Sequence, residues 1–494
     1  MKCILLSILL LQTGLLMAQT SRSLPETTGG DRLTTSQKFF RTDTAYLQVH
    51  ISGYTPEPGM ESGMIYLHNE ITGESAPTVV NIHPDGKLSC KFVINHPTEN
   101  RIHLNDETIP FYIEPGETPT LLVDRNNMIG DNCVSYTGAS ANINQLLNSA
   151  NSLLIYNNGE LLKACKTTSP PQFAKQLRPL FCLWEQRIDS LIAANRYSEK
   201  AVHLLRNKLS IKKGTILLDF LSIRSYYATK DSANSILQIR EDDNYYDFLK
   251  EMPLNDETIL ASLEFRTFIN RFEYMTPIRE ENRTDIINRL CGTPNPLVWQ
   301  IAGIRRLSYM LNFVEDREIS VDYLTTLKQG LQHPFFLSEA ERIFNKIQSE
   351  EKSNSYELPA GRSADIFRNI IQPHQGKVLF VNFWATSCGG CRLGIEQTAK
   401  LREKYKNHPE FQFIFITSER ASPTGAYTKY IEKHLTGEAS YRISETEFNH
   451  LMELFHFSGI PHYELIEKKG SVSTKKLSTL NLAPYLEKRF GENK

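Results

Sequence analysis

The sequence has no excess of charge of either sign. Its 494 residues carry 55 Lys and Arg against 56 Asp and Glu, which gives a formal net charge of −1 at pH 7. Proteins that bind nucleic acids usually show a basic excess or a basic surface stripe, so the composition does not favour a nucleic-acid partner. With 40% hydrophobic residues, the chain is typical of an ordinary globular protein of two or three domains.

The chain also lacks a second pair of closely spaced cysteines. Only Cys388 and Cys391 form a Cys-x-x-Cys pair, and no histidine cluster accompanies them. A structural zinc site takes four ligands, usually from two such pairs. The sequence therefore predicts no metal site and no bound cofactor.

No disulfide framework is visible in the rest of the chain. Beyond the N-terminal run and the Cys-x-x-Cys pair, five cysteines remain, an odd number at irregular spacings. We expect most of them to be buried apolar residues, with a Cys165–Cys182 bridge as the alternative. The five are Cys90, Cys133, Cys165, Cys182 and Cys291.

Long apolar runs are absent except at the N-terminus. Met1-Lys2 precedes an apolar run over residues 3–18, which is short for a membrane span and is interrupted at Gln12-Thr13-Gly14. This pattern predicts a signal peptide, residues 1–18, cleaved near Ala18-Gln19, with an uncleaved anchor as the alternative. We therefore expect the protein in the periplasm or cell envelope, with peripheral membrane contact or none.

The most informative stretch surrounds the cysteine pair. Val378–Phe383 is a short run rich in β-branched and aromatic residues, as in a strand buried on both faces. From Cys388 to about residue 405 the spacing is helical, with Cys391, Ile395 and Ala399 on one face. Cys388 is therefore expected at the N-terminus of a helix.

That position favours redox chemistry. Unpaired backbone N–H groups and the positive end of the helix dipole stabilise a thiolate, the nucleophile of thiol–disulfide exchange. We expect Cys388 to be the nucleophile and Cys391, one turn further on, to be the resolving cysteine. An inert structural disulfide and a metal site are the weaker interpretations.

Two motifs in the C-terminal part resemble a known family. FWATSCGGC, residues 383–391, is similar to the Phe-Trp-Ala-Thr-Trp-Cys-Gly-Pro-Cys of the TlpA-like thiol–disulfide oxidoreductases, which belong to the thioredoxin superfamily, and Gly459-Ile460-Pro461 is similar to that family's Gly-(Ile/Val)-Pro. The resemblance covers roughly residues 358–490. It implies a thioredoxin fold in which Pro461 is cis and faces the dithiol, with Trp384, Ile460 and Pro461 binding substrate. A plain trans proline at the start of a strand is the alternative for Pro461.

The resemblance also implies partners and a direction. Proteins of this family reduce disulfides of other envelope proteins, with electrons arriving from a membrane thiol carrier. In an oxidising compartment such a supply is needed to keep the pair reduced.

The chain departs from the family pattern at several positions. As a result, no acidic side chain that could accept the proton of Cys391 is evident. Glu396 is displaced along the helix, and His462 is more consistent with a surface-facing strand residue. The departures are Ser387 for the usual Trp, Gly390 for the usual Pro, Gly394 where relatives often carry Glu, and Asn382 where cytosolic thioredoxins have Asp.

On the N-terminal side of the residues that resemble this family, the pattern of apolar residues changes twice. Residues 19–44 are expected to be a flexible leader. Over residues 45–125 strand signals dominate, such as Leu47, Val49 and Ile51 alternating with polar residues, and a strand pair is expected around the Glu114-Pro115-Gly116 turn. Residues 141–348 then show helical spacing, with Ser338-Glu339-Ala340-Glu341 in the form of a capping box.

These signals predict a multidomain chain: an N-terminal β-sandwich, an all-α middle region, a polar linker over residues 349–356, and a C-terminal α/β thioredoxin fold over residues 357–492. The predicted function is a secreted thiol–disulfide oxidoreductase that reduces protein disulfides. One alternative is an oxidant or isomerase that uses the same site. The other is an envelope binding or scaffold protein with a non-catalytic thioredoxin-like module.

Overall fold

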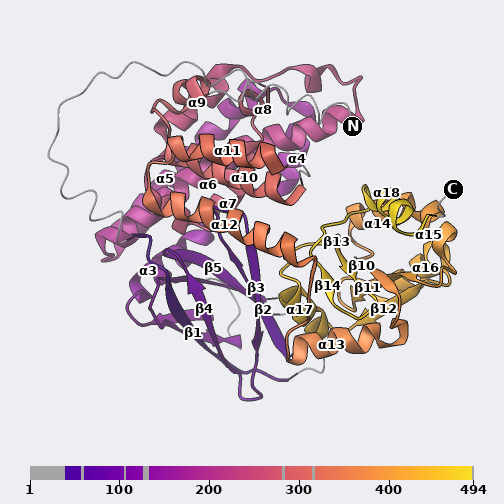
Figure 1. The fold of residues 1–494 in the computed structure, drawn as a ribbon. Helices are drawn as coiled ribbons and strands as arrows, with labels where there is room; N and C mark the ends of the chain where they lie inside the picture. The colour runs from indigo at the N-terminus through magenta and orange to yellow at the C-terminus, as the bar shows by residue number, and fades with distance from the viewer. Residues whose placement is uncertain are drawn as a thin grey trace.

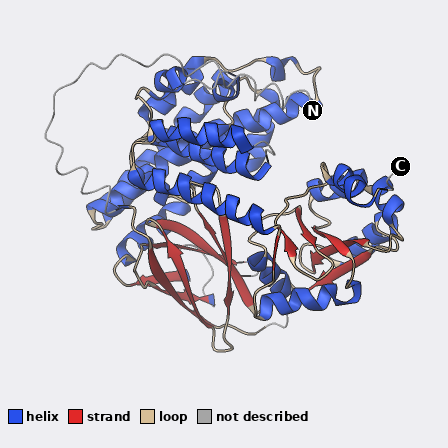
Figure 2. Cartoon of the chain, viewed as in Figure 1, coloured by secondary structure: helices blue, strands red, loops and turns tan. Residues whose placement is uncertain are grey.

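The computed structural model describes residues 39–56, 61–104, 107–125, 133–280, 284–313 and 317–491. The expected signal peptide and residues 19–38 of the expected leader lie outside them. The described residues form three parts in chain order: a β-sandwich, a helical region and an α/β module (Figures 1 and 2). This order confirms the predicted fold class.

The β-sandwich consists of two four-stranded sheets, in the orders β4-β1-β7-β8 and β3-β2-β5-β6. Apolar residues alternate along the strands and meet between the sheets, as Leu47, Val49 and Ile51 show on β1. The strands are β1 (Asp43–Ser52), β2 (Ser62–His68), β3 (Ser75–Asn81), β4 (Lys87–Ile94), β5 (Thr98–Leu104), β6 (Glu107–Ile113), β7 (Thr120–Asp124) and β8 (Val134–Thr137).

Two expectations for this part are wrong. The strands on either side of Glu114-Pro115-Gly116, β6 and β7, do not pair with each other, because β6 pairs with β5 and β7 lies parallel to β1 in the other sheet. The expected leader, residues 19–44, also extends too far along the chain. Phe40 is buried and stacks on Phe335 with ring centroids 4.8 Å apart, and β1 already begins at Asp43.

The helical region packs around one large apolar core that includes Trp184, Phe220 and Phe268. No helix in the described part of the chain is long and apolar enough to cross a membrane. Its α-helices are α3 (Ala141–Asn151), α4 (Asn158–Thr167), α5 (Pro170–Ala194), α6 (Glu199–Lys230), α7 (Phe265–Glu273), α8 (Thr276–Glu280), α9 (Thr284–Cys291), α10 (Leu297–Phe313), α11 (Arg317–Gly330) and α12 (Pro334–Ser353), with 3-10 turns at Ser235–Gln238, Asp243–Glu251 and Glu257–Ala261.

Three details of the helical region correct the sequence analysis. Helix α12 begins at Pro334, where the His333 ring accepts a hydrogen bond from Phe335 N at 3.1 Å, so Ser338 lies inside the helix and caps nothing. The same helix runs to Ser353 and takes up most of the expected linker 349–356. The Cys165–Cys182 bridge is absent, because Cys165 is buried beside α6 while Cys182 is exposed on α5.

The α/β module is built on a mixed six-stranded sheet in the order β12-β11-β10-β13-β14-β9. Strands β10, β11 and β12 are parallel, and β13 is antiparallel to β10. The elements are β9 (Ser355–Tyr356), α13 (Arg362–Ile371), a 3-10 turn (Gln372–His374), β10 (Val378–Phe383), α14 (Gly389–Gln397), α15 (Ala399–Tyr405), β11 (Phe411–Ser418), α16 (Thr424–His434), β12 (Ala439–Ile443), α17 (Glu445–Leu454), β13 (His462–Ile466), β14 (Val472–Ser473) and α18 (Leu482–Phe490).

Helices cover both faces of this sheet, as predicted. Leu379, Val381 and Phe383 of β10 point toward α13 and α17, while Val378 and Phe380 point toward α14 and α18. The side chains of β10 are all buried, which explains its continuous apolar sequence.

The α/β module is docked on the β-sandwich rather than tethered to it. Helix α17 lies against β2 and β3 (Figure 1). The Glu453 carboxylate accepts a hydrogen bond from Val79 N at 3.0 Å, which occupies part of the edge of β3, and Met64 enters the core under α17. Helix α12 also contacts the sandwich, since Asn69 donates to its Glu339 at 2.6 Å, and it leads directly into β9 of the α/β module.

Candidate functional site

The cysteine pair lies at the start of α14, which follows β10 after a short turn. Cys388 and Cys391 form a disulfide with an S–S distance of 2.08 Å and Cα atoms 5.3 Å apart. Cys388 is the N-cap of α14, and Cys391 N donates a hydrogen bond to its Sγ at 3.1 Å. Cys388 is half-buried, whereas Cys391 is fully buried. Cys388 is thus the more accessible of the two cysteines.

The expected continuous helix after the pair is interrupted. Helix α14 ends at Gln397 and α15 starts at Ala399, with the Thr398 hydroxyl donating back to Gly394 O at 2.9 Å. Cys391 and Ile395 share the buried face as expected, but Ala399 is exposed because the break changes the register.

A hydroxyl network holds the turn before Cys388. Thr386 N donates to Ser422 Oγ at 2.9 Å, and Ser422 Oγ lies 2.7 Å from Thr417 Oγ1. The hydroxyls of Thr386 and Ser387 both donate to Ala421 O. The loop after β11 therefore fixes the backbone that leads into the helix. No sequence motif surrounds Ser422, so this support could not be predicted from the sequence.

Pro461 lies next to the pair, and the Ile460–Pro461 peptide bond is cis. Ile460 O is 3.7 Å from Cys388 Sγ, and a Cβ at Gly390 would be 3.7 Å from Pro461 Cδ. Pro461 is exposed and Ile460 partly exposed. Both residues are therefore open to solvent beside Cys388.

Trp384 does not fit its expected substrate-binding role. Its side chain is 0% exposed and packs against Tyr430 and Tyr427 of α16, with ring centroids 5.0 and 6.3 Å away. The two tyrosines of α16 bury the indole, so a bound substrate could not contact it. Trp384 instead forms part of the floor beneath the turn that carries Cys388.

Neither weak candidate for a base approaches Cys391. Glu396 is half-exposed and faces His434 at 4.0 Å. His462 is not the surface residue that the sequence suggested: its Nε2 lies 2.7 Å from Glu464 Oε1, and its ring stacks on Phe457 at 4.2 Å. His462 pairs with Phe383 in the sheet, and Phe383 packs on the face opposite Cys391.

Two apolar side chains near the pair are exposed. Leu393, on α14, is 56% exposed and Leu480 is 85% exposed. Their neighbours approach each other, because a Cβ at Gly394 would lie 3.4 Å from Thr479 Cγ2. Single exposed leucines are common, but two exposed leucines from neighbouring segments form a small apolar patch.

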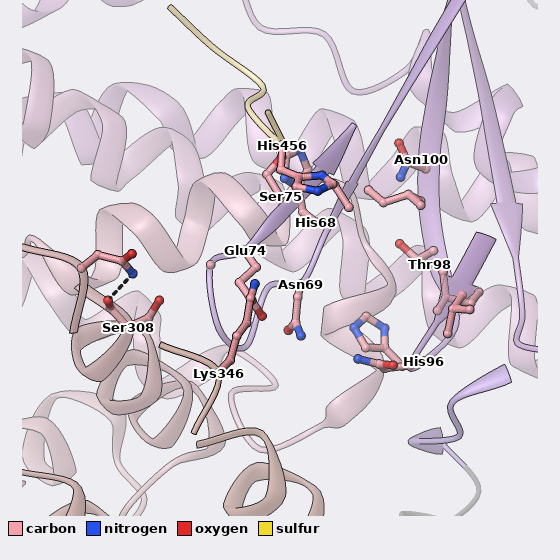
Figure 3. Close-up of a pocket in the computed structure, with 17 residues that line it drawn as sticks. His68, Asn69, Glu74, Ser75, His96, Thr98, Asn100, Ser308, Lys346 and His456 are labelled. Atoms are coloured by element: carbon pink, nitrogen blue, oxygen red, sulfur yellow. Dashed lines mark hydrogen bonds and ion pairs between the residues drawn. The ribbon is translucent and has the colours of Figure 1, made fainter. Parts of the chain in front are cut away.

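A separate cavity of about 530 Å³ lies where the three parts meet, and it contains neither cysteine (Figure 3). His68, Glu74 and Ser75 of the sandwich, Lys346 of α12 and His456 after α17 line it. Burial first, and then Arg266 and Arg305, lower the pKa of His68 to about 3, so this imidazole is neutral. No group of three or more His, Cys, Asp or Glu within the described ranges could hold a metal ion.

Residues 376–472 match the family described as Thioredoxin-like. The thioredoxin domain of a thiol-disulfide oxidoreductase from Bacteroides vulgatus is 22% identical, over 24% of this chain and 83% of that chain, with a TM-score of 0.22. A thiol:disulfide interchange protein from Bacteroides sp. is 23% identical, over 24% and 76%, at 0.22. StoA from Bacillus subtilis is 18% identical, over 24% and 87%, at 0.21. No curated protein matches the chain.

The family match and the sheet order agree. The C-terminal α/β module has a thioredoxin-like fold, and the cysteine pair lies within the matched residues.

Proposed function

We propose that this protein is an envelope thiol–disulfide oxidoreductase whose Cys388–Cys391 pair reduces disulfides of partner proteins. The observation that carries the proposal is the Cys388–Cys391 disulfide at the start of α14, with Ile460 O 3.7 Å from the Cys388 sulfur. Cys388 is more exposed to solvent than Cys391, which suits a nucleophile and a buried resolving thiol. The start of α14 favours the Cys388 thiolate.

The reaction starts from the reduced pair. The Cys388 thiolate attacks one sulfur of a partner disulfide, and a bond forms between Cys388 and that sulfur. The second partner sulfur leaves as a thiolate and takes up a proton from water. Cys391 then gives its proton to water and attacks Cys388 Sγ. The bond between Cys388 and the partner sulfur breaks, the Cys388–Cys391 bond re-forms, and the partner leaves as a thiolate that takes up a proton from water. Two electrons pass from the pair to the partner, and the structure shows the oxidised pair that remains.

The surroundings of the pair suit a protein partner. Pro461 and Ile460 are open to a peptide backbone beside Cys388, and Leu393 and Leu480 are exposed nearby. We assign the direction as reduction, with a membrane thiol carrier as the electron source. The expected signal peptide and the resemblance to TlpA-like proteins support this direction and place.

The experiment that tests the proposal is the reduction potential of the pair. The purified mature protein is equilibrated in graded thiol buffers, and free thiols are counted with an alkylating mass tag. A potential close to that of thioredoxin, about −270 mV, supports a reductase, and one near about −120 mV indicates an oxidant. The Cys388→Ser/Cys391→Ser variant provides the baseline from the other cysteines.

The remaining alternative gives a different result. If the protein is a scaffold with an inactive module, no reversible two-electron transition appears in any thiol buffer. Turnover of a model protein disulfide by the full-length mature chain then separates a redox enzyme from such a scaffold. Absence of both signals would overturn the proposed function.

A further inference from the structure

The polar groups on the Cys391 side of the sheet are few. On this face of β10 the polar residue is Asn382, which is 2% exposed and whose Oδ1 has no hydrogen-bond partner in the described structure. Directly opposite it in the register of β13 stands Tyr463. The other residues that β10 and β13 place on this face, Val378, Phe380 and Leu465, are apolar. The polar side chains that these two strands place on this face are therefore the Asn382 amide and the Tyr463 phenol.

Tyr463 occupies the space that a side chain at position 394 would fill. A Cβ placed on Gly394 would be 3.0 Å from the Tyr463 hydroxyl oxygen, which is tighter than ordinary van der Waals contact. Gly394 follows Cys391 by three residues, so the two positions share one face of α14. Both are buried against the sheet. The glycine thus allows the phenol to lie against α14 at the position three residues after Cys391.

The Tyr463 ring is held in this place. It stacks on Phe380 with centroids 5.3 Å apart and an interplanar angle of 19°. Burial raises the pKa of Tyr463, while a hydrogen bond from the Thr479 hydroxyl acts in the opposite direction. The phenol therefore keeps its proton at neutral pH, and with Thr479 donating to its oxygen, that proton can be given to another acceptor.

We propose that the Tyr463 hydroxyl donates a hydrogen bond to the Cys391 thiolate once the disulfide is reduced, and so sets the pH at which Cys391 can resolve a mixed disulfide. Tyr463 is thus a positioning and thiolate-stabilising residue of the resolving step. This inference rests on the proposed function, because only a cycling pair needs an ionised Cys391. The proton of Cys391 goes to water, and the hydrogen bond from Tyr463 favours the charged sulfur that remains.

The buried Arg402 of α15 pairs with Glu438 and donates to the backbone oxygens of Ile395 and His434. Titratable groups on the other neighbouring elements are directed elsewhere. Those on α14, α16 and the segment before α18 have partners of their own, as the following contacts show. Glu396 faces His434, Tyr430 donates to Arg392 O, Tyr427 packs on Trp384, Arg392 is exposed, and Lys475 lies over the Tyr485 ring.

The test is a thiolate titration that needs no partner. Cys391 is titrated by ultraviolet thiolate absorbance in the full-length Cys388→Ser variant, with the Cys388→Ser/Cys391→Ser variant subtracted. Adding Tyr463→Phe removes the hydroxyl alone. We expect the titration midpoint to rise by about one pH unit, which makes the thiolate about tenfold scarcer at neutral pH, as for loss of one hydrogen bond to a charged group.

Two further variants keep the test specific. Gly394→Ala places a methyl group against the phenol oxygen and should raise the midpoint in the same direction, which gives a second reading if Tyr463→Phe folds poorly. Tyr441→Phe removes a hydroxyl that lies 2.7 Å from His374 Nε2, at a strand on the far edge of the sheet, and should leave the midpoint unchanged.

An unchanged midpoint in Tyr463→Phe and Gly394→Ala, or an equal shift in Tyr441→Phe, would overturn the assignment to Tyr463. Failure of the proposed function would appear in a different measurement. A scaffold protein would show no reversible redox transition, while its Cys391 could still be titrated. The two failures are therefore distinguishable.

Discussion

Lys208 and Glu99 form an ion pair between the helical region and the β-sandwich in which both side chains are almost completely buried, at 5% and 3% exposed. Lys208 comes from α6 and Glu99 from β5. The Lys208 ammonium also donates to Asn151 Oδ1 at 2.7 Å, and Leu263 N donates to Glu99 Oε2 at 3.3 Å. Since each charge has a hydrogen-bond partner besides the other, the pair can exist without water at this boundary.

Removal of one partner should destabilise the protein strongly. Lys208→Met leaves the Glu99 carboxylate buried without its cation, and we expect a loss of roughly 3–5 kcal/mol in the free energy of unfolding. Urea unfolding followed by circular dichroism measures it. The double variant Lys208→Met/Glu99→Leu should recover most of the loss, because no unpaired charge remains.

A surface pair is the matched control. Lys404 and Glu487 lie 3.4 Å apart at 57% and 63% exposure. Lys404→Met should therefore change the unfolding free energy by less than about 1 kcal/mol. Equal effects at the two sites would show that the buried pair does not hold the two parts together.

The elements that the sequence predicted correctly depend on local patterns. The alternation of Leu47, Val49 and Ile51 predicted β1 because side chains of a strand alternate between its faces, whatever the strand pairs with. The strand pair around Glu114-Pro115-Gly116 was wrong because pairing is not local. Leu121 of β7 finds its partner in Val49, far back in the chain, and this register carries no signal in the turn itself.

The same difference between local patterns and long-range contacts applies to the residues of the site. Cys388, Cys391 and Pro461 were found because they sit in short motifs. The burial of Trp384 could not be predicted, since it depends on tyrosines of α16 that pack over it from a separate part of the module. Tyr463 was missed for the same reason, because its place next to Gly394 follows only from the register of β13 against β10.

The proposed reaction predicts a trapped intermediate. In Cys391→Ser the accessible Cys388 can still attack a partner disulfide, but nothing resolves the bond that forms. Mixed disulfides with envelope proteins should accumulate in cells and should be visible as reducible high-mass bands on non-reducing gels. Cys388→Ser should give none.

A third variant guards against adventitious oxidation in this experiment. Cys182 is exposed on α5, outside the α/β module, and Cys182→Ser should leave the trapped bands of Cys391→Ser unchanged. Loss of the bands in the Cys182→Ser background would move the reactive thiol away from Cys388 and contradict the mechanism.

The turn between β2 and β3 should lose stability in acid through Glu74. Burial acts to raise the pKa of this carboxyl, but hydrogen bonds from Arg342 and Lys346 of α12 lower it to about 2, from an ordinary 4.5. Because the folded pKa is the lower one, the contribution is complete above about pH 4.5 and is lost as the pH falls toward 2.

Glu74→Gln tests this pH course. The variant should be less stable than the parent protein at pH 7, and the difference should disappear near pH 2, as read from unfolding midpoints across the pH range. Asp365→Asn is the control, because its partner Arg368 is one turn away on a surface where Asp365 is 65% exposed. A constant difference at every pH would mean that Glu74 acts through packing rather than charge.

Glu70, four residues earlier, should show the opposite pH dependence. Burial raises its pKa to about 7, against weaker effects of a backbone hydrogen bond, Arg266 and Arg305. Its Oε2 has no hydrogen-bond partner in the described structure, and His96 Nε2 lies 3.9 Å away. A raised folded pKa means that the stability is present below about pH 4.5 and is lost as the pH rises through 7.

Glu70→Gln keeps the shape of the side chain and removes its ionisation. We expect the variant to match the parent protein near pH 4 and to exceed it above pH 7, by roughly 3 kcal/mol, since each pKa unit corresponds to about 1.4 kcal/mol. Unfolding midpoints over the same pH series as for Glu74→Gln measure the effect. The stability contributions of two glutamates in one turn would then have opposite pH dependences, because α12 supplies cations to Glu74 while burial dominates at Glu70, whose Oε2 has no hydrogen-bond partner in the described structure. Parallel curves for the two variants would contradict this assignment.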